Sequence, residues 1–266
     1  MFMRTCSHSS NSPLRISFHL ASCSVLEVNP LSWKSSQSST LSKVIMSCRR
    51  SPNAHSLIRD PNASDSEANS ASSSPLRKFG FAATPPLDLP AVAGSVFPEA
   101  SSFKRNLPGL AQSAIGQQDV NATPLEMALV AAGVANGGVI MKPHVLAEIR
   151  DNEGQVVRKA EPAPWMTAMR PENAVALRDM MIGVVNGGTA TRIALPGIQV
   201  AAKTGTAQTT GDNSHAWIIG FAPAEAPRVA IAVIVESQEG LGDTVTGGRV
   251  AAPIARAVLQ AALAAP

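Results

Sequence analysis

One short segment, Val200-Ala-Ala-Lys-Thr-Gly-Thr-Ala-Gln208, gathers residue types that could do chemistry. Lys203 offers a positive charge that can polarise a hydroxyl group or assist proton transfer. Thr204 and Thr206, two residues apart in an extended segment, place their hydroxyls on the same face. Gly205 lets a ligand approach the backbone, whose N–H groups can stabilise an oxyanion. The segment is therefore suited to hold a carboxylate or a peptide carbonyl, although Lys-Thr-Gly alone is also common at ordinary strand ends.

Three strands are predicted to position these residues. Residues 198–208 form the first, residues 216–221 the second, and the almost wholly apolar residues 229–236 a third that is buried on both faces. The six-residue link 222–227 predicts that the last two strands pair as an antiparallel hairpin.

Helices are predicted on both sides of these strands in the sequence. Thr123-Pro-Leu-Glu126 combines an N-cap, a first-turn proline and a capping-box glutamate, and starts a helix that runs to Asn136. A second helix begins at Pro171 and ends at Gly187-Gly188, and a terminal helix covers residues 250–264. This order predicts an α/β (α+β) fold, with helices packed on an antiparallel sheet.

The first 78 residues differ in composition from the rest. Residues 1–75 hold 22 of the 28 serines and all three cysteines, whereas all 19 glycines follow from Gly80 onward. Sustained period-2 or period-3.6 patterning is also missing there. Two interpretations stay open, a disordered serine-rich segment and a segment translated in the wrong reading frame. We expect residues 1–78 to contribute no fold and residues 79–266 to form the domain.

Composition argues against several classes of function. A net charge of +3, 4% aromatic residues and the absence of tyrosine disfavour a nucleic-acid surface. Three irregularly spaced cysteines and five scattered histidines suggest neither a metal site nor a disulfide framework, and no cofactor is predicted. Leu20-Ala-Ser-Cys23 imitates a lipoprotein signal, but the segment before it is too short and polar, so no anchor or signal peptide is predicted.

Several further blocks accompany the Lys-Thr-Gly segment in a definite order. They are Ser113-Ala-Ile-Gly-Gln117, Thr123-Pro-Leu-Glu-Met-Ala128, Ala135-Asn-Gly-Gly138, Pro143-His144, Val185-Asn-Gly-Gly-Thr-Ala190, Lys203-Thr-Gly-Thr-Ala-Gln208 and His215-Ala-Trp-Ile-Ile-Gly-Phe-Ala-Pro223. Lys-Thr-Gly is the third signature of penicillin-binding proteins and β-lactamases. Together the blocks resemble the transpeptidase domain of class B penicillin-binding proteins over residues 79–266, most closely those of high-GC Gram-positive bacteria.

The resemblance implies a partial penicillin-binding protein/β-lactamase-like fold and a bacterial peptidoglycan D,D-transpeptidase. In that family an active-site serine attacks the D-Ala-D-Ala end of a stem peptide during cell-wall synthesis and cell division, and β-lactams acylate the same serine. The stem peptide and β-lactams are therefore the implied partners, with cell-wall synthesis or division proteins as further ones. Relatives are anchored in the cytoplasmic membrane with this domain outside.

The resemblance also implies a role for each residue of the motif. Lys203 would supply positive charge and hydrogen bonds near the nucleophile, and the Thr206 N–H would form half of the oxyanion hole. The hydroxyls of Thr204 and Thr206 would hold the terminal carboxylate, and Gly205 would leave room for the substrate backbone. Ala202 stands where the family often has glycine.

The nucleophile is expected to be missing. Ser101-Ser-Phe-Lys104 fits the Ser-x-x-Lys pattern, but it precedes Lys203 by about half the family's usual interval, with no Ser-x-Asn between them. Ser9-Ser-Asn11 and Ser51-Pro-Asn53 match the second motif by letters only, inside a serine-rich segment. The chain as written is therefore expected to be inactive as an acyl-transfer enzyme, and its sheet to lack the upstream helices that normally cover it.

Three alternatives remain. A β-lactamase-like serine hydrolase is possible, although the Ala-Ile-Gly-Gln and His-Ala-Trp blocks favour a transpeptidase. A non-catalytic fragment that binds partners through its surface helices is another. An unrelated hydrolase using Asp212, Ser214 and His215 is disfavoured, because these residues are too crowded to line up in a relay.

Overall fold

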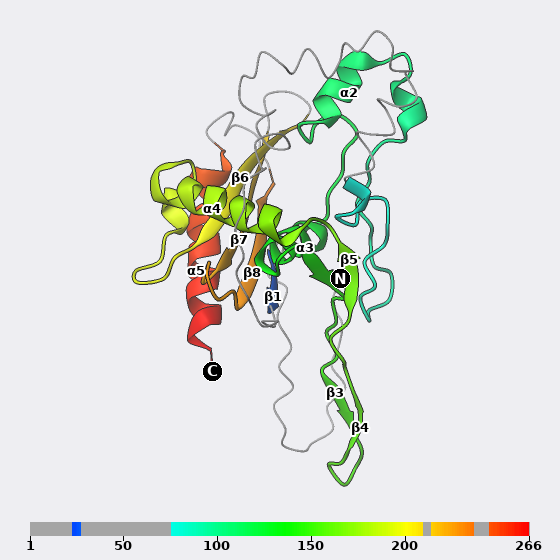
Figure 1. Ribbon diagram of the computed structural model, residues 1–266, viewed down its shortest axis with the longest axis vertical. Coiled ribbons are helices and arrows are strands. Elements are labelled where there is room, and N and C mark those ends of the chain that lie inside the picture. Colours follow the sequence, from blue (N-terminus) through cyan, green and yellow to red (C-terminus); the bar gives the residue numbers. More distant parts are fainter. Residues whose placement is uncertain (1–22, 28–75, 210–213, 237–244, 266) are drawn as a thin grey trace.

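The computed structural model describes residues 23–27, 76–209, 214–236 and 245–265. They form a four-stranded antiparallel sheet with helices on both of its faces (Figure 1). The strand order is β1 (Cys23–Glu27), β8 (Val229–Val235), β7 (Ser214–Ala222) and β6 (Ala201–Gln208). The predicted antiparallel sheet of three neighbouring strands, and the α+β class, are confirmed.

The composition of β8 explains its central place. Its Val-Ala-Ile-Ala-Val-Ile-Val sequence is rich in β-branched residues, and Val229 to Val233 are buried. Successive side chains enter different layers, since Ala230 packs in one hydrophobic cluster and Ile231 in another. The prediction that this strand is buried on both faces is confirmed over these five residues.

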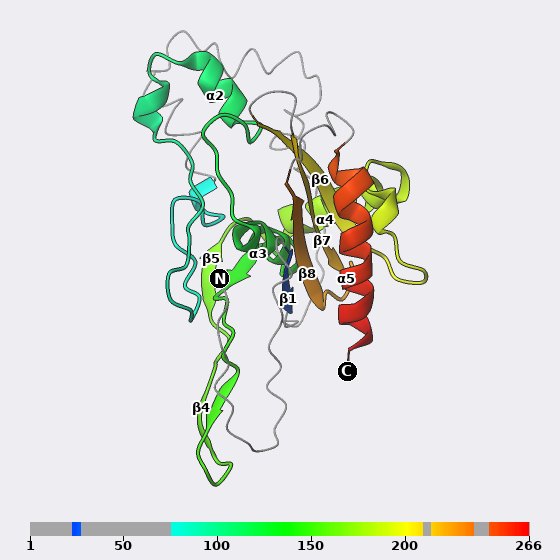
Figure 2. The same cartoon turned by 180° about the vertical axis from the view of Figure 1, so that it is seen from behind.

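The helices lie in two layers. On one face, α3 (Pro124–Ala135) and α4 (Pro171–Gly187) contribute Ala131 and Met181 to a cluster with Phe221 of β7. On the other face, the π-helix η5 (Gly247–Ala251) continues into α5 (Ala252–Ala264), whose Leu259 packs near Ile218. Figure 1 shows α4 in front of the sheet, and Figure 2, from behind, shows α5 in front. Helices of this chain therefore cover both faces of the central strands.

The strand β1 lies within the serine-rich segment, where the sequence predicts no element. It pairs with β8 from Cys23↔Val233 to Glu27↔Val229. Its Val-Leu centre suits a strand, but five residues are too few for a periodic signal. Residues 1–22 and 28–75, which carry the other features noted in this segment, lie outside the described residues.

The start of α3 departs from the predicted capping box. Thr123 caps the helix as expected, its Oγ1 accepting a hydrogen bond from the Glu126 N–H at 3.1 Å. The return bond is not made, because the Thr123 N–H donates to Ser95 Oγ at 3.0 Å. The Glu126 carboxyl is instead fully buried beside Gly80 and Trp165, with no hydrogen-bond partner among the described residues. This desolvation raises its pKa from 4.5 to about 7.

Several short elements were not predicted. They are η2 (Ala100–Phe103), α2 (Leu107–Ser113), η3 (Thr191–Ile193) and two small two-stranded sheets. One pairs β2 (Val139–Met141) with β5 (Pro164–Thr167), and the other is the hairpin of β3 (Glu148–Arg150) and β4 (Val156–Lys159). Every residue of β3 and β4 is exposed, so these strands show no apolar alternation. Within the described parts of the chain, no helix combines the length and apolar character that crossing a membrane requires.

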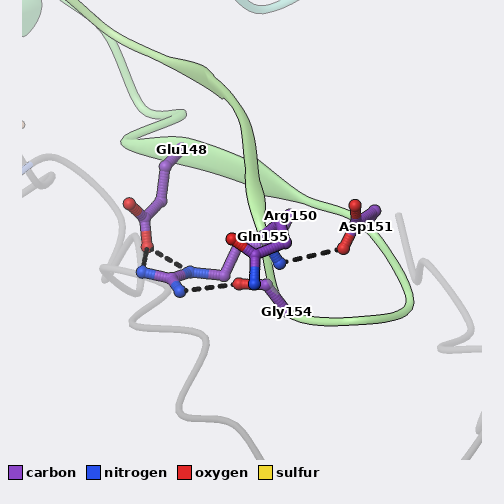
Figure 3. A network of polar contacts seen from close by, with 5 residues as sticks. All are labelled: Glu148, Arg150, Asp151, Gly154 and Gln155. Atoms are coloured by element: carbon purple, nitrogen blue, oxygen red, sulfur yellow. Dashed lines mark hydrogen bonds and ion pairs between the residues drawn. The ribbon is translucent and has the colours of Figure 1, made fainter.

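Polar contacts hold the tip of the β3–β4 hairpin together (Figure 3). Arg150 donates to the Glu148 carboxylate at 2.7 Å and to the Gly154 carbonyl at 2.9 Å. Asp151 Oδ1 accepts from the Gln155 N–H at 2.9 Å. The hairpin projects away from the sheet and plays no part in the site described next.

Candidate functional site

The structure places all four predicted site residues on one strand, β6. Among the described strands β6 ends the sheet, and its residues pair with β7 from Lys203↔Ile219 to Thr206↔Ala216. Lys203 and Thr206 are exposed, and Thr204 and Gly205 are half-buried. The predicted motif therefore lies along an accessible edge of the sheet.

Strand alternation separates the cation from the hydroxyls. Ala202 packs in the cluster that contains α5, whereas Ala201 packs in the cluster that contains α3 and α4. Because side chains two residues apart share a face, Thr204 and Thr206 lie on the α5 side and Lys203 on the opposite side. A ligand lying along the edge can be contacted from both sides.

Two hydrogen bonds show which way the backbone of β6 points. Gln117 Nε2 donates to the Thr206 carbonyl at 3.3 Å, and Lys203 Nζ donates to the Thr204 carbonyl. In an antiparallel ladder the N–H and C=O of one residue point the same way, toward the partner strand or away from it. Because the Thr206 carbonyl accepts the bond from Gln117, it points toward the open edge and not toward β7. The Thr206 N–H therefore faces the open edge too. This direction suits the predicted oxyanion donor.

The hydroxyl of Thr204 has a partner that sequence reasoning missed. Its Oγ1 lies 2.6 Å from Oγ1 of Thr189, which follows the end of α4. Gln117 was missed in the same way. Both residues lie inside blocks that carried the family resemblance, but their contacts with β6 join positions 15 and 89 residues apart. Local sequence patterns do not reveal pairings over such separations.

The other predicted candidates do not join this site. Ser101 is exposed on η2, which ends at Phe103 with Lys104 as its C-cap, and η2 packs on α2. Ser214 and His215 are consecutive residues of β7, so their side chains leave opposite faces of the strand. A relay through both is therefore excluded by geometry, and Asp212 lies outside the described residues.

Comparison with known proteins agrees with this fold. The model of the penicillin binding protein transpeptidase domain matches residues 67–260. Peptidoglycan D,D-transpeptidase PbpA of Mycobacterium tuberculosis is 38% identical over 192 residues, which cover 70% of this chain and 38% of that protein. PbpA of Mycolicibacterium smegmatis is 41% identical over 160 residues, covering 58% of this chain and 32% of that protein. The chain belongs to the penicillin-binding protein transpeptidase family.

Solved structures show the same relationship. The D,D-transpeptidase domain of a peptidoglycan glycosyltransferase from Eggerthella lenta superposes with a TM-score of 0.64 at 32% identity, covering 75% of this chain and 50% of that one. The ceftriaxone acyl-enzyme complex of penicillin-binding protein A from M. tuberculosis gives a TM-score of 0.61 at 37% identity, covering 71% and 42%. The predicted family and partial transpeptidase fold are confirmed, and the chain spans less than half the length of the two curated relatives.

Proposed function

We propose that β6 binds the D-Ala-D-Ala end of a peptidoglycan stem peptide, or a β-lactam, as one wall of a bacterial D,D-transpeptidase site. The supporting observation is the set of groups on its free edge. The Thr204 and Thr206 side chains lie on the same face of the strand. The Thr206 N–H points away from β7, toward the open edge where a ligand would lie. Three hydrogen-bond donors therefore converge on a ligand that carries a carboxylate next to a carbonyl.

Each group has a distinct part in this proposal. The threonine hydroxyls donate to the terminal carboxylate, and the Thr206 N–H donates to the carbonyl oxygen that gains negative charge during acyl transfer. Lys203 adds positive charge from the other face of the strand, where it can assist a serine nucleophile. Gly205, which has no side chain, lets the ligand backbone lie against the strand.

Acyl transfer needs a serine that attacks this carbonyl and a group that removes its proton. Ser101 does not fit this task, because it is exposed on η2, which packs on α2 rather than on β6. We infer that Ser101 forms no acyl-enzyme and that the residues of β6 supply recognition rather than covalent chemistry. The proposed substrate is a cell-wall peptide, so the domain would work on the outer face of the cytoplasmic membrane.

Binding of acetyl-D-Ala-D-Ala tests the proposal. The dipeptide is titrated into the 15N-labelled chain, with acetyl-L-Ala-L-Ala as the stereochemical control. Removing one hydroxyl that donates to a carboxylate costs about 1.5–3 kcal/mol, so Thr204→Val and Thr206→Val should each weaken binding by about tenfold or more. Thr167→Val, an exposed threonine on β5, is the matched control. Equal affinity for both dipeptides, or unchanged affinity in both β6 variants, would overturn the proposal.

A further inference from the structure

We propose that Thr189 is a positioning residue of this site, which directs the Thr204 hydroxyl proton toward the carboxylate of the ligand. This inference rests on the proposed function of β6. The 2.6 Å separation between the two Oγ1 atoms is that of a short O–H···O hydrogen bond, and either hydroxyl can be its donor.

Proton counting selects the direction of this bond when an anion is present. A threonine hydroxyl has one proton to donate and can accept as well. If Thr204 donates to Thr189, it has no proton left for a ligand. If Thr189 donates to Thr204, the Thr204 proton is free to donate to a carboxylate. A bound carboxylate therefore favours a chain of hydrogen bonds from Thr189 through Thr204 to the anion, in which each bond strengthens the next.

The surroundings hold the backbone of Thr189 in place. Three segments meet there: the end of α4, the strand β6 and the start of η5. A Cβ on Gly248 would lie 2.1 Å from the Thr189 carbonyl oxygen, so the first turn of η5 packs directly against this residue. A Cβ on the preceding Gly188 would lie 2.8 Å from the backbone of Val184. Gly188 and Gly248 thus permit close packing of the segments that surround the hydroxyl pair.

The local charge and exposure also suit an anionic ligand. The Thr189 side chain is exposed and Thr204 is half-buried, so the pair is reachable from solvent. Arg192, three residues after Thr189, donates from Nη1 to the Arg249 carbonyl at 3.2 Å. Arg249 is itself exposed and follows Gly248. Arg249 belongs to η5, which packs against β6, so this side of the strand lies near basic residues whose positive charge favours a carboxylate.

A positioning role for Thr189 can be distinguished from a role in stabilising its loop alone. A purely structural residue would change affinity for every ligand of the site to the same degree. A positioning residue changes affinity for the carboxylate and leaves an uncharged analogue almost unaffected. The ratio of the two affinities is therefore the quantity to measure.

The experiment compares acetyl-D-Ala-D-Ala with its C-terminal amide in NMR titrations of the full chain. The variants are Thr189→Val, which loses the hydroxyl at nearly constant shape, and Thr189→Ser, which keeps it. Thr191→Val, an exposed threonine two residues further on, is the matched control. We expect Thr189→Val to weaken carboxylate binding by about three- to tenfold, the range of one neutral hydrogen bond, and to leave amide binding unchanged. Thr189→Ser should restore the wild-type ratio.

The possible outcomes separate this inference from the proposed function. If the wild-type chain prefers the carboxylate and Thr189→Val keeps the full preference, the role of Thr189 is wrong while the function of β6 stands. If Thr189→Val weakens both ligands equally, its role is structural and the inference is again wrong. If the wild-type chain binds neither ligand, the proposed function itself fails.

Discussion

The buried carboxyl of Glu126 predicts an unusual dependence of stability on pH. Its pKa is about 7 in the folded protein because burial disfavours the charged form, against an ordinary value of 4.5. A raised folded pKa means that the folded state holds a proton which the unfolded state has already released. Stability is therefore complete below about pH 4.5 and falls as the pH rises toward 7. At about 1.4 kcal/mol per pH unit, the loss amounts to about 3 kcal/mol.

Urea unfolding at several pH values between 4.5 and 8 measures this loss. Glu126→Gln keeps the shape of the side chain and removes its ionisation, so it should become increasingly more stable than wild type as the pH rises. Glu172→Gln is the matched control, because Glu172 occupies the first turn of α4 as Glu126 occupies that of α3, but lies at the surface paired with Arg170. The control should retain the pH dependence of wild type. Parallel curves for wild type and Glu126→Gln would refute the burial argument.

Three further predictions concern the packing around β6 and the absence of a nucleophile. Gly248→Ala should lower the free energy of unfolding in urea by about 1–3 kcal/mol, since its Cβ would lie 2.1 Å from the backbone carbonyl oxygen of Thr189. Gly187→Ala, whose Cβ would meet open space, should leave stability almost unchanged. An equal loss of stability in both variants would contradict the close packing of Gly248 against Thr189. Gln117→Ala should speed hydrogen exchange at the end of β6 while costing at most about 1 kcal/mol, whereas unchanged exchange would show that its bond to Thr206 is unimportant. Benzylpenicillin should leave the intact mass of the chain unchanged, and a serine-linked adduct removed by hydroxylamine would disprove the absence of a nucleophile.

Much of the central fold could be predicted from local sequence signals. Prolines at the first turns and glycines at the ends located α3 and α4, and the continuous apolar run located β8. The hairpin of β3 and β4 was missed because all residues of both strands are exposed. Without a buried face, the sequence shows no alternation of apolar and polar residues that would predict a strand. A division of the chain near residue 78 stays a prediction, and the family match begins twelve residues before Phe79.

The site was predicted in part for the same physical reason. Residues adjacent in the sequence, such as Lys203 to Thr206, are necessarily close in space, so their chemistry could be inferred from one segment. Partners such as Thr189 and Gln117 come from distant segments and required the fold. The capping box shows the converse, because Ser95 competes for the N–H that local rules assign to Glu126. The local sequence therefore predicted the start of α3 correctly, but it predicted the wrong position for the Glu126 carboxyl.

A map of backbone amide shifts during titration with acetyl-D-Ala-D-Ala tests whether the open edge of β6 binds this ligand. We predict that the largest shifts fall on Thr204, Gly205 and Thr206, with smaller ones at Thr189 and the start of η5. The N–H of Thr206 should shift more than that of Gly205, because it faces the open edge of the sheet. Saturable shifts that leave β6 unchanged and fall elsewhere in the chain would contradict the claim that this edge recognises the D-alanyl carboxylate.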